Sequence, residues 1–266
     1  MGEKIQKKDK AAILAAIEWD GFPEDFEKEW FQDPDIRRAL VDVEPWNYEE
    51  FPKELQNNRD IALECVKVRG DVYEYLPEKL KKEEDILEAA IRNGLNLQVL
   101  VNWLFHPVSE IAEKMLKRTD LVATAIGTHG GNQMVYADNS AWADKELANL
   151  ALSKGFCHVS RLPKNMAAEK ETVKQVVRNI PEKDTDECWQ IIDLPEQLRF
   201  DEEFLLELIA ICPTALKVIK DTKKLPNRVN CFPEINTAFY RRAYQVNKAC
   251  SRYMSKEMKA LVKEEQ

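Results

Sequence analysis

The sequence predicts an all-α protein, a solenoid-like array of about eight or nine short helical-hairpin repeats closed by a longer C-terminal helix. Three observations predict this fold. Acidic residues recur every 25 residues, each ahead of apolar residues at helical spacing. The chain has only eight Gly, about half the usual ~7% share, which disfavours Gly-rich doubly wound folds and all-β sandwiches. Seven of the twelve Pro follow an aromatic residue or Leu, where a short helix can begin.

The 25-residue period is clearest in four consecutive windows that align without gaps. Each begins with an acid and continues with apolar residues at i, i+4 and i+5. The windows are 35–41, 60–66, 85–91 and 110–116. An acid in the first turn favours a helix because it interacts with the positive end of the helix dipole. We expect further copies at Glu146, Glu171 and Glu203, and a first copy at 10–14.

Each predicted helix ends nine or ten residues after its acid, at a Gly or a Pro. Gly accepts the left-handed backbone that follows a helix, and Pro cannot continue one. The helix-ending residues are Pro45, Gly70, Gly94, Gly155, Pro181 and Pro213. A short second helix then starts at a Pro, flanked by apolar residues that form a hydrophobic staple. One such unit cannot bury its apolar face alone, so stacking of units is expected.

The spacing of the acids also predicts how the domain is divided. It lengthens from 25 to 36 residues between Glu110 and Glu146, where three of the eight Gly lie. We therefore expect a single helical-repeat domain over 1–266. Its parts are a capping repeat (1–32), regular repeats (33–126), an inserted Gly-rich loop (127–139), irregular repeats (140–231) and a C-terminal capping helix (232–266).

Residues 59–94 carry a specific version of the repeat, with Leu76-Pro77-Glu78-Lys79-Leu80 and a helix end at Arg92-Asn93-Gly94. This pattern resembles the helical repeat family catalogued as domain of unknown function four-one-one-six. The resemblance covers 33–106 closely and 140–219 more loosely. It implies an all-helical repeat fold found in bacterial, phage and protist proteins, including some pathogen effectors. It implies no catalytic residue.

Charge and cysteine content exclude several classes of function. The net charge of −8 disfavours a global attraction to nucleic acid or to an anionic membrane. The six Cys form no C-x-x-C pair, which argues against a zinc ribbon, and most lie among apolar residues as small buried hydrophobes. Buried thiols are typical of a reducing compartment. With no signal-like segment or membrane span, we expect a cytoplasmic protein, in the host cytoplasm if it is a phage product or translocated effector.

The Gly-rich segment 127–139 is the first candidate binding site, because Gly lets a backbone approach a ligand closely. The alternative is an ordinary long turn between helices. Its candidate residues are His129, Gly130, Gly131, Asn132, Tyr136 and Asp138, with His129 and Asp138 as a conceivable acid–base pair.

The acidic stretch 18–60 is the second candidate, with 14 acids against five bases and three of the six Trp. Trp19, Trp30 and Trp46 would suit a basic protein partner, because Trp is a strong interface anchor. The alternative is an end-capping repeat in which the aromatic residues belong to the core.

The basic stretch 239–263 is the third candidate, with seven bases against Glu257 alone. We expect one amphipathic helix whose cations contact phosphate or an acidic partner. The alternative is a solvated face of a capping helix. The candidate residues are Arg241, Arg242, Lys248 and Arg252. An acidic start and a basic end also leave head-to-tail association into a homo-oligomer open.

The sequence offers little chemistry. It has three His in no zinc-protease motif, no phosphate-binding loop and no G-x-S-x-G, so we expect no catalytic residue, no metal and no cofactor. The function that we predict is a non-enzymatic protein–protein interaction module, in the manner of a phage or bacterial effector or inhibitor of a target protein. Two alternatives stay open. One is an enzyme or small-ligand binder with its site at 127–139, and the other is nucleic-acid binding through the C-terminal helix.

Overall fold

The structure is a computed structural model that describes residues 9–22, 26–101, 109–181, 188–221, 232–233 and 235–263. Every regular element in these ranges is an α-helix or a 3-10 helix, and they contain no strand, so the all-α prediction is confirmed. The chain divides into two compact units, which are described separately. The first comprises Met1–His129 with Tyr136–Ala141, and the second comprises Gly130–Val135 with Trp142–Gln266.

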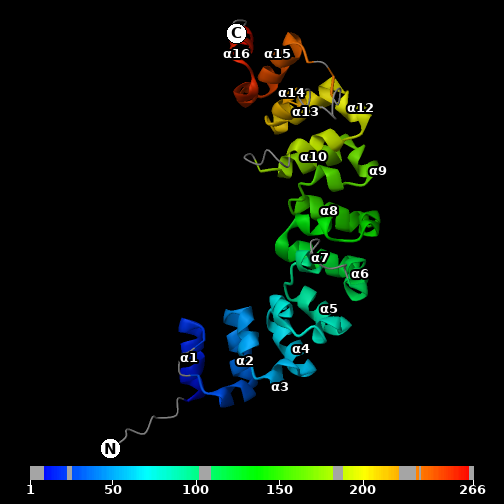
Figure 1. The fold of residues 1–266 in the computed structure, drawn as a ribbon. Coiled ribbons are helices and arrows are strands. Elements are labelled where there is room, and N and C mark those ends of the chain that lie inside the picture. Colours follow the sequence, from blue (N-terminus) through cyan, green and yellow to red (C-terminus); the bar gives the residue numbers. More distant parts are fainter. Residues whose placement is uncertain are drawn as a thin grey trace, which may run out of the picture. The chain divides into compact units, whose positions relative to one another are not determined.

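The first unit is built from helices of nine to eleven residues in which each long helix contacts the next. Figure 1 shows them side by side, in blue to green. These helices are α1 (Lys10–Asp20), α2 (Pro34–Val43), α4 (Arg59–Val68), α5 (Glu84–Arg92) and α7 (Thr119–His129). Shorter elements join them: η1 (Lys28–Gln32), η2 (Pro45–Glu50), α3 (Lys53–Gln56), η3 (Gly70–Tyr75), η4 (Leu80–Lys82), η5 (Leu97–Val101) and α6 (Glu110–Leu116).

Helix α2 shows why the periodic sequence folds in this way. The Asp33 side chain caps the helix by accepting a hydrogen bond from the Asp35 amide at 2.9 Å. Ile36, Leu40 and Val41, the apolar positions at i, i+4 and i+5, are completely buried. The predicted pattern therefore reports a true buried face. The same spacing buries Ile86, Ala90 and Ile91 on α5. On α4 the buried residues are Ala62, Cys65 and Val66, at i, i+3 and i+4.

The acids that open the helices are paired rather than simply solvated. The Lys10 ammonium on α1 lies 2.9 Å from Asp33, and this contact lowers the pKa of Asp33. On α10 and α13 of the second unit, Lys170 and Asp201 form the equivalent link at 2.5 Å. Neighbouring helices are thus joined by exposed ion pairs near their N-termini, each worth little by itself.

The longer interval between successive long helices lies earlier in the chain than the spacing of the acids predicted. Glu110 lies in α6, a helix of seven residues, and the acid in the first turn of the following long helix is Asp120. Helices α4 and α5 begin 25 residues apart, whereas α5 and α7 begin 35 residues apart, at Glu84 and Thr119. The extra residues therefore precede α7, and part of that segment, 102–108, lies outside the described residues. The gapless alignment of Glu110 with Asp85 was wrong, because a short and a long amphipathic helix share the same local pattern.

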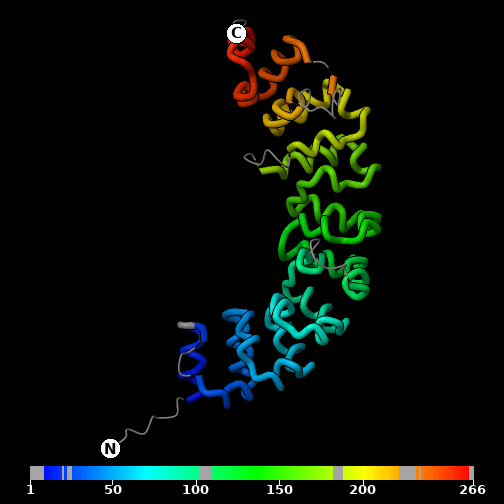
Figure 2. Tube along the Cα trace, viewed as in Figure 1, coloured from blue at the N-terminus to red at the C-terminus, as the bar shows by residue number. Residues whose placement is uncertain are grey.

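The second unit repeats the alternation of long and short elements, from green to red in Figures 1 and 2. Its longer helices are α8 (Lys145–Ser153), α10 (Lys170–Asn179), α13 (Glu202–Ile211) and α15 (Thr237–Val246); α13 contacts both α10 and α15. Its shorter elements are η6 (Gly131–Val135), η8 (Val159–Arg161), α9 (Lys164–Ala167), η9 (Gln190–Asp193), α12 (Glu196–Arg199), α14 (Ala215–Asp221), η11 (Lys248–Tyr253) and α16 (Lys256–Leu261). A further 3-10 helix, η7, spans Asn139–Ala143.

The single long helix predicted within 232–266 is instead three short elements, α15, η11 and α16. Asn247 breaks the first helix with an extended backbone, and its side chain accepts a hydrogen bond from the Ala249 amide at 3.0 Å. Ser255 caps α16 by accepting from the Met258 amide at 3.1 Å. Asn and Ser favour such breaks because their side chains satisfy the free amides of a new helix start. None of the described helices is long and apolar enough to cross a membrane.

Candidate binding surfaces

The Gly-rich segment makes a close backbone contact with the end of α8, and we call such a contact a joint. The Gly131 amide, at the start of η6, donates to the Lys154 carbonyl at the end of α8, at 2.8 Å. A Cβ atom on Gly131 would lie 2.1 Å from the Ala151 carbonyl oxygen and 2.4 Å from the Phe156 nitrogen. The backbone at Gly131 packs directly against the backbone at Ala151 and Phe156, and only Gly permits so close an approach. The space that we expected to admit a ligand is filled by α8.

The first unit contains the same joint at Gly70, the first residue of η3. The Gly70 amide donates to the Asn93 carbonyl at 2.8 Å, and an added Cβ would lie 2.1 Å from the Ala90 carbonyl oxygen. In both joints the helix that receives the Gly ends at a second Gly with positive φ, +98° at Gly94 and +91° at Gly155. Gly131 thus has a counterpart in Gly70 of the first unit. Where an inserted loop was predicted, the structure has the end of α7, η6 and the start of η7.

Asn132 and His129, two polar residues of this segment, form hydrogen bonds with other parts of the protein. Asn132 accepts a hydrogen bond from the Cys157 amide at 3.1 Å through its side-chain oxygen. The exposed His129 ring lies with Nε2 at 2.8 Å from the Gly94 carbonyl oxygen. These contacts give both side chains a structural role.

Asp138 also has a structural role. Its carboxylate accepts hydrogen bonds from the Ser140 amide at 2.9 Å and hydroxyl at 2.6 Å, and these bonds lower its pKa. Because His129 and Asp138 each have another partner, the structure gives no support to an acid–base pair. Gly130 has a positive φ of +91°, and Tyr136 is half-buried.

The aromatic residues of the acidic stretch divide into a core group and a surface group. Phe31, Tyr48 and Phe51 are buried, with ring centroids 5.2 Å apart for both Phe31–Phe51 and Tyr48–Phe51. Trp19 at the end of α1 is 86% exposed and Trp46 on η2 is 50% exposed, whereas Trp30 is half-buried. The capping-repeat alternative therefore explains the Phe and Tyr residues but not Trp19 and Trp46.

Helix α1 adds an apolar stripe to the exposed Trp19. Its inner face buries Ile13 and Ile17, and the helix contacts α2. Its other face exposes Ala11, Ala15 and Trp19, which recur every four residues and so share one side of the helix. A surface helix normally carries charges on that side. This side of α1 is therefore an unusual apolar surface, and it is bordered by the exposed acid Glu18.

The basic residues predicted at the C-terminal end lie in different environments. Arg242 on α15 pairs with Glu202 of α13 at 2.9 Å and also contacts Glu203, so its charge is balanced within the unit. Arg241 is half-buried and Lys248 is exposed. Arg242 lines a small hollow between α13 and α15, and Arg252, on η11, lines a larger one.

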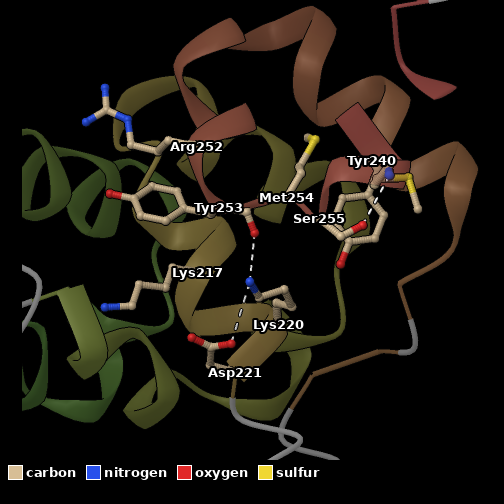
Figure 3. A pocket seen from close by; sticks show the side chains of 9 residues that line it. Lys217, Lys220, Asp221, Tyr240, Arg252, Tyr253, Met254 and Ser255 are labelled. Atoms are coloured by element: carbon tan, nitrogen blue, oxygen red, sulfur yellow. Dashed lines mark hydrogen bonds and ion pairs between the residues drawn. The ribbon is translucent and has the colours of Figure 1, made fainter. Parts of the chain in front are cut away.

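The larger hollow has a volume of about 400 Å³ and is formed by α14, α15, η11 and α16 (Figure 3). Its lining residues are Lys217, Lys220, Asp221, Tyr240, Arg252, Tyr253, Met254, Ser255 and Met258. The Lys220 ammonium donates to the Tyr253 carbonyl at 2.7 Å and lies 3.7 Å from the Asp221 carboxylate. Burial raises the pKa of Tyr240, and the Asp221 charge adds to this effect.

Two cations of the hollow, Lys217 and Arg252, come from different elements. Figure 3 shows the ends of Lys217, Arg252 and the Tyr253 ring on the same side of the hollow. The Arg252 guanidinium lies 5.9 Å from the centroid of that ring, and its Nε donates to the Ala249 carbonyl. The basic stretch of the sequence indicated Arg252 but not Lys217, which lies on α14, outside that stretch. No spacing rule connects these two positions.

The described residues contain no group of three or more His, Cys, Asp or Glu that could hold a metal ion.

Residues 33–81 match the family model described as "Domain of unknown function (DUF4116)". This segment comprises α2, η2, α3, α4, η3 and part of η4, and the match confirms the resemblance to this family within 33–81. No curated protein and no solved structure matches the chain.

Proposed function

We propose that this protein is a non-enzymatic protein-binding module that captures a basic segment of a partner through the acidic, Trp-bearing surface of its first unit. The observation that carries the proposal is the 86% exposure of Trp19 on an uncovered apolar side of α1. Trp is the residue type most enriched among interface hot spots, and a stably folded protein gains nothing by leaving it in water.

The charge around the two exposed Trp residues supports a basic partner. Glu18 precedes Trp19, and the exposed Glu49 and Glu50 follow Trp46 on η2. The stretch 18–60 holds 14 acids against five bases. Acids around an apolar anchor speed association with a basic segment and disfavour acidic competitors.

The wider setting follows from the family. Consecutive long helices contact each other in the first unit and from α10 to α15 in the second, which suits a solenoid-like array, and such arrays commonly bind other macromolecules. The family resemblance suggests a phage or bacterial effector or inhibitor that acts in the cytoplasm, the host cytoplasm if it is translocated. Head-to-tail association of the acidic and basic ends stays a further proposal.

Replacing both Trp19 and Trp46 with Ala is expected to weaken binding of Lys/Arg-rich peptides at least tenfold, about 1.4 kcal/mol, without changing thermal stability. Both side chains are exposed, so their removal costs little packing. Isothermal titration of the full chain with Lys/Arg-rich peptides and matched Asp/Glu-rich peptides measures the effect.

The matched control is Phe200→Ala, which removes an aromatic side chain of the second unit that is 44% exposed. It should leave peptide affinity unchanged. The proposal fails if acidic peptides bind as well as basic ones, or if Phe200→Ala weakens binding as much as the double Trp variant does.

The hollow of the second unit supports a second candidate function, binding of a small phosphorylated ligand. Its volume of about 400 Å³ lies within the range of ligand pockets. Lys217 and Arg252 supply two cations beside a Tyr ring, and Arg and Lys are the usual partners of phosphate. Asp221 offsets part of the charge but is held by Lys220.

Replacing Lys217 and Arg252 together with Gln is expected to reduce the affinity for a phosphate monoester at least tenfold, because both charge-assisted contacts are lost. NMR titration of the full chain with inorganic phosphate and glycerol phosphate measures it. Lys248→Gln is the control, since Lys248 lies on the same η11 but outside the hollow. Equal losses in both variants would contradict the candidate. So would tight binding of duplex DNA with a steep salt dependence, which would instead favour nucleic-acid binding.

A further inference from the structure

Two buried cysteines of the second unit lie with their sulfur atoms together. The Sγ atoms of Cys188 and Cys212 are 3.8 Å apart. This distance allows a hydrogen bond between the thiols but is too long for a disulfide bond, and both cysteines are free. Cys188 is fully buried just before η9, and Cys212, which ends α13, is 5% exposed. The two positions are 24 residues apart, so no C-x-x-C motif revealed them.

The surroundings favour a thiolate at one member of this pair. The hydrogen bond with Cys188, helped by the Thr214 and Ala215 amides, lowers the pKa of Cys212 although burial opposes the shift. The cysteines that lack such donors behave in the opposite way. Burial raises the pKa of Cys65 to about 12 and that of Cys250 to about 11. The Cys212 sulfur has a second thiol within hydrogen-bond distance.

We propose that Cys188 and Cys212 form a reversible redox-modification site that closes into a disulfide when it meets hydrogen peroxide. The geometry carries the proposal, because the second thiol already stands in van der Waals contact with the first. A disulfide requires the sulfur atoms to approach to about 2.05 Å, a movement of less than ~2 Å in all. Cys212 is the first to react because it is the more exposed of the two and its thiolate is the nucleophile.

The reaction balances with hydrogen peroxide as the two-electron oxidant. The Cys212 thiolate attacks one peroxide oxygen, the O–O bond breaks, and the departing hydroxide takes a proton to become water, leaving a sulfenic acid. The Cys188 sulfur then attacks the sulfenic sulfur; the S–S bond forms, the S–O bond breaks, and the Cys188 proton leaves with the hydroxyl as a second water. A thiol reductant restores both thiols by exchange and is itself oxidised to its disulfide.

The disulfide would add a covalent bond where the two thiols are now in contact. It would tie the end of α13 to the segment before η9, which contacts α14. A cross-link that closes a loop of this length restricts the unfolded chain. The oxidised protein should therefore unfold about 5 °C higher than the reduced protein.

The decisive experiment treats the full chain with hydrogen peroxide at neutral pH and maps the products by peptide mass spectrometry. We expect one linked peptide pair containing Cys188 and Cys212, with a mass loss of about 2 Da that dithiothreitol reverses. In Cys188→Ala, oxidation should stop at Cys212 as a sulfenic acid, about 16 Da heavier, which dimedone traps. Cys65→Ala and Cys250→Ala should oxidise as the unaltered protein does, because neither residue belongs to the pair.

A second measurement needs no variant and so does not depend on how a substitution folds. Alkylation by iodoacetamide, followed residue by residue at several pH values, should show Cys212 reacting faster than Cys65 and Cys250 below pH 8. The proposal is overturned if Cys65 or Cys250 alkylates as fast as Cys212. It is also overturned if peroxide yields no disulfide between Cys188 and Cys212 before over-oxidation of Cys212.

Discussion

Gly131→Ala is expected to destabilise the second unit by about 3 kcal/mol, a large effect for one methyl group. The added Cβ would lie 2.1 Å from the Ala151 carbonyl oxygen and 2.4 Å from the Phe156 nitrogen. Both are backbone atoms, one within α8 and one just after it, so neither can rotate away as a side chain could. Relief requires η6 to move, which also breaks the 2.8 Å hydrogen bond from the Gly131 amide to Lys154.

Urea unfolding followed by circular dichroism measures this change, and hydrogen exchange around α8 shows that the second unit is the one affected. The control is Gly127→Ala in the same Gly-rich segment, where an added Cβ meets nothing within 4 Å. Because Gly127 lies inside α7, Ala should stabilise the protein by about 0.5–1 kcal/mol. Gly70→Ala should reproduce the Gly131 effect in the first unit. If Gly131→Ala and Gly127→Ala behave alike, the joint does not hold the helices together.

Arg37→Met is expected to destabilise the first unit by about 3 kcal/mol. The Arg37 side chain is 7% exposed and links three points of the fold. Its guanidinium donates to the Phe31 carbonyl at 2.9 Å and the Gln32 carbonyl at 3.0 Å, at the end of η1, and to Glu64 of α4 at 3.1 Å. Met fills most of the same volume but leaves the two carbonyls without this donor, and Glu64 keeps only its contact with the more exposed Arg38.

The neighbouring Arg38→Met provides the control for this prediction. Arg38 is 50% exposed and pairs with Asp35 at 3.3 Å and with Glu64 at 3.4 Å, so its loss should cost less than about 1 kcal/mol. Denaturant unfolding of both variants at the same pH gives the comparison. A cost below about 1 kcal/mol for Arg37→Met would mean that the buried link contributes no more than a surface pair.

The helices that sequence reasoning located best are those whose signals are local. In α2 and α4, the first-turn acid and the apolar residues lie within ten consecutive residues, and the structure has a helix at each of these positions. The same reasoning failed at Glu110, because a seven-residue helix carries the same short pattern as the long helices. It also failed at Asn247 and Ser255, whose side-chain caps outweigh a continuous apolar pattern.

The candidate sites depended on contacts that no local pattern encodes. Whether Gly131 faces a ligand or α8 is decided by residues about twenty positions further along the chain. The exposure of Trp19 and the burial of Phe31 depend on which side of each element a neighbour covers. The Cys188–Cys212 pair and the meeting of Lys217 with Arg252 likewise join separate elements. The sequence could name these residue types but not their neighbours.

The contacts between neighbouring helices have a consequence for synthesis of the chain. Helix α1 contacts α2, α2 contacts α4, α4 contacts α5 and α5 contacts α7, so each helix finds its partner a short distance back along the chain. Helical domains with such local contacts fold within microseconds to milliseconds, whereas a ribosome adds about 5–20 residues each second. One repeat takes longer than a second to emerge. Each helix of the first unit can therefore dock on its predecessor before the next is complete, and its apolar face is exposed only briefly to aggregation.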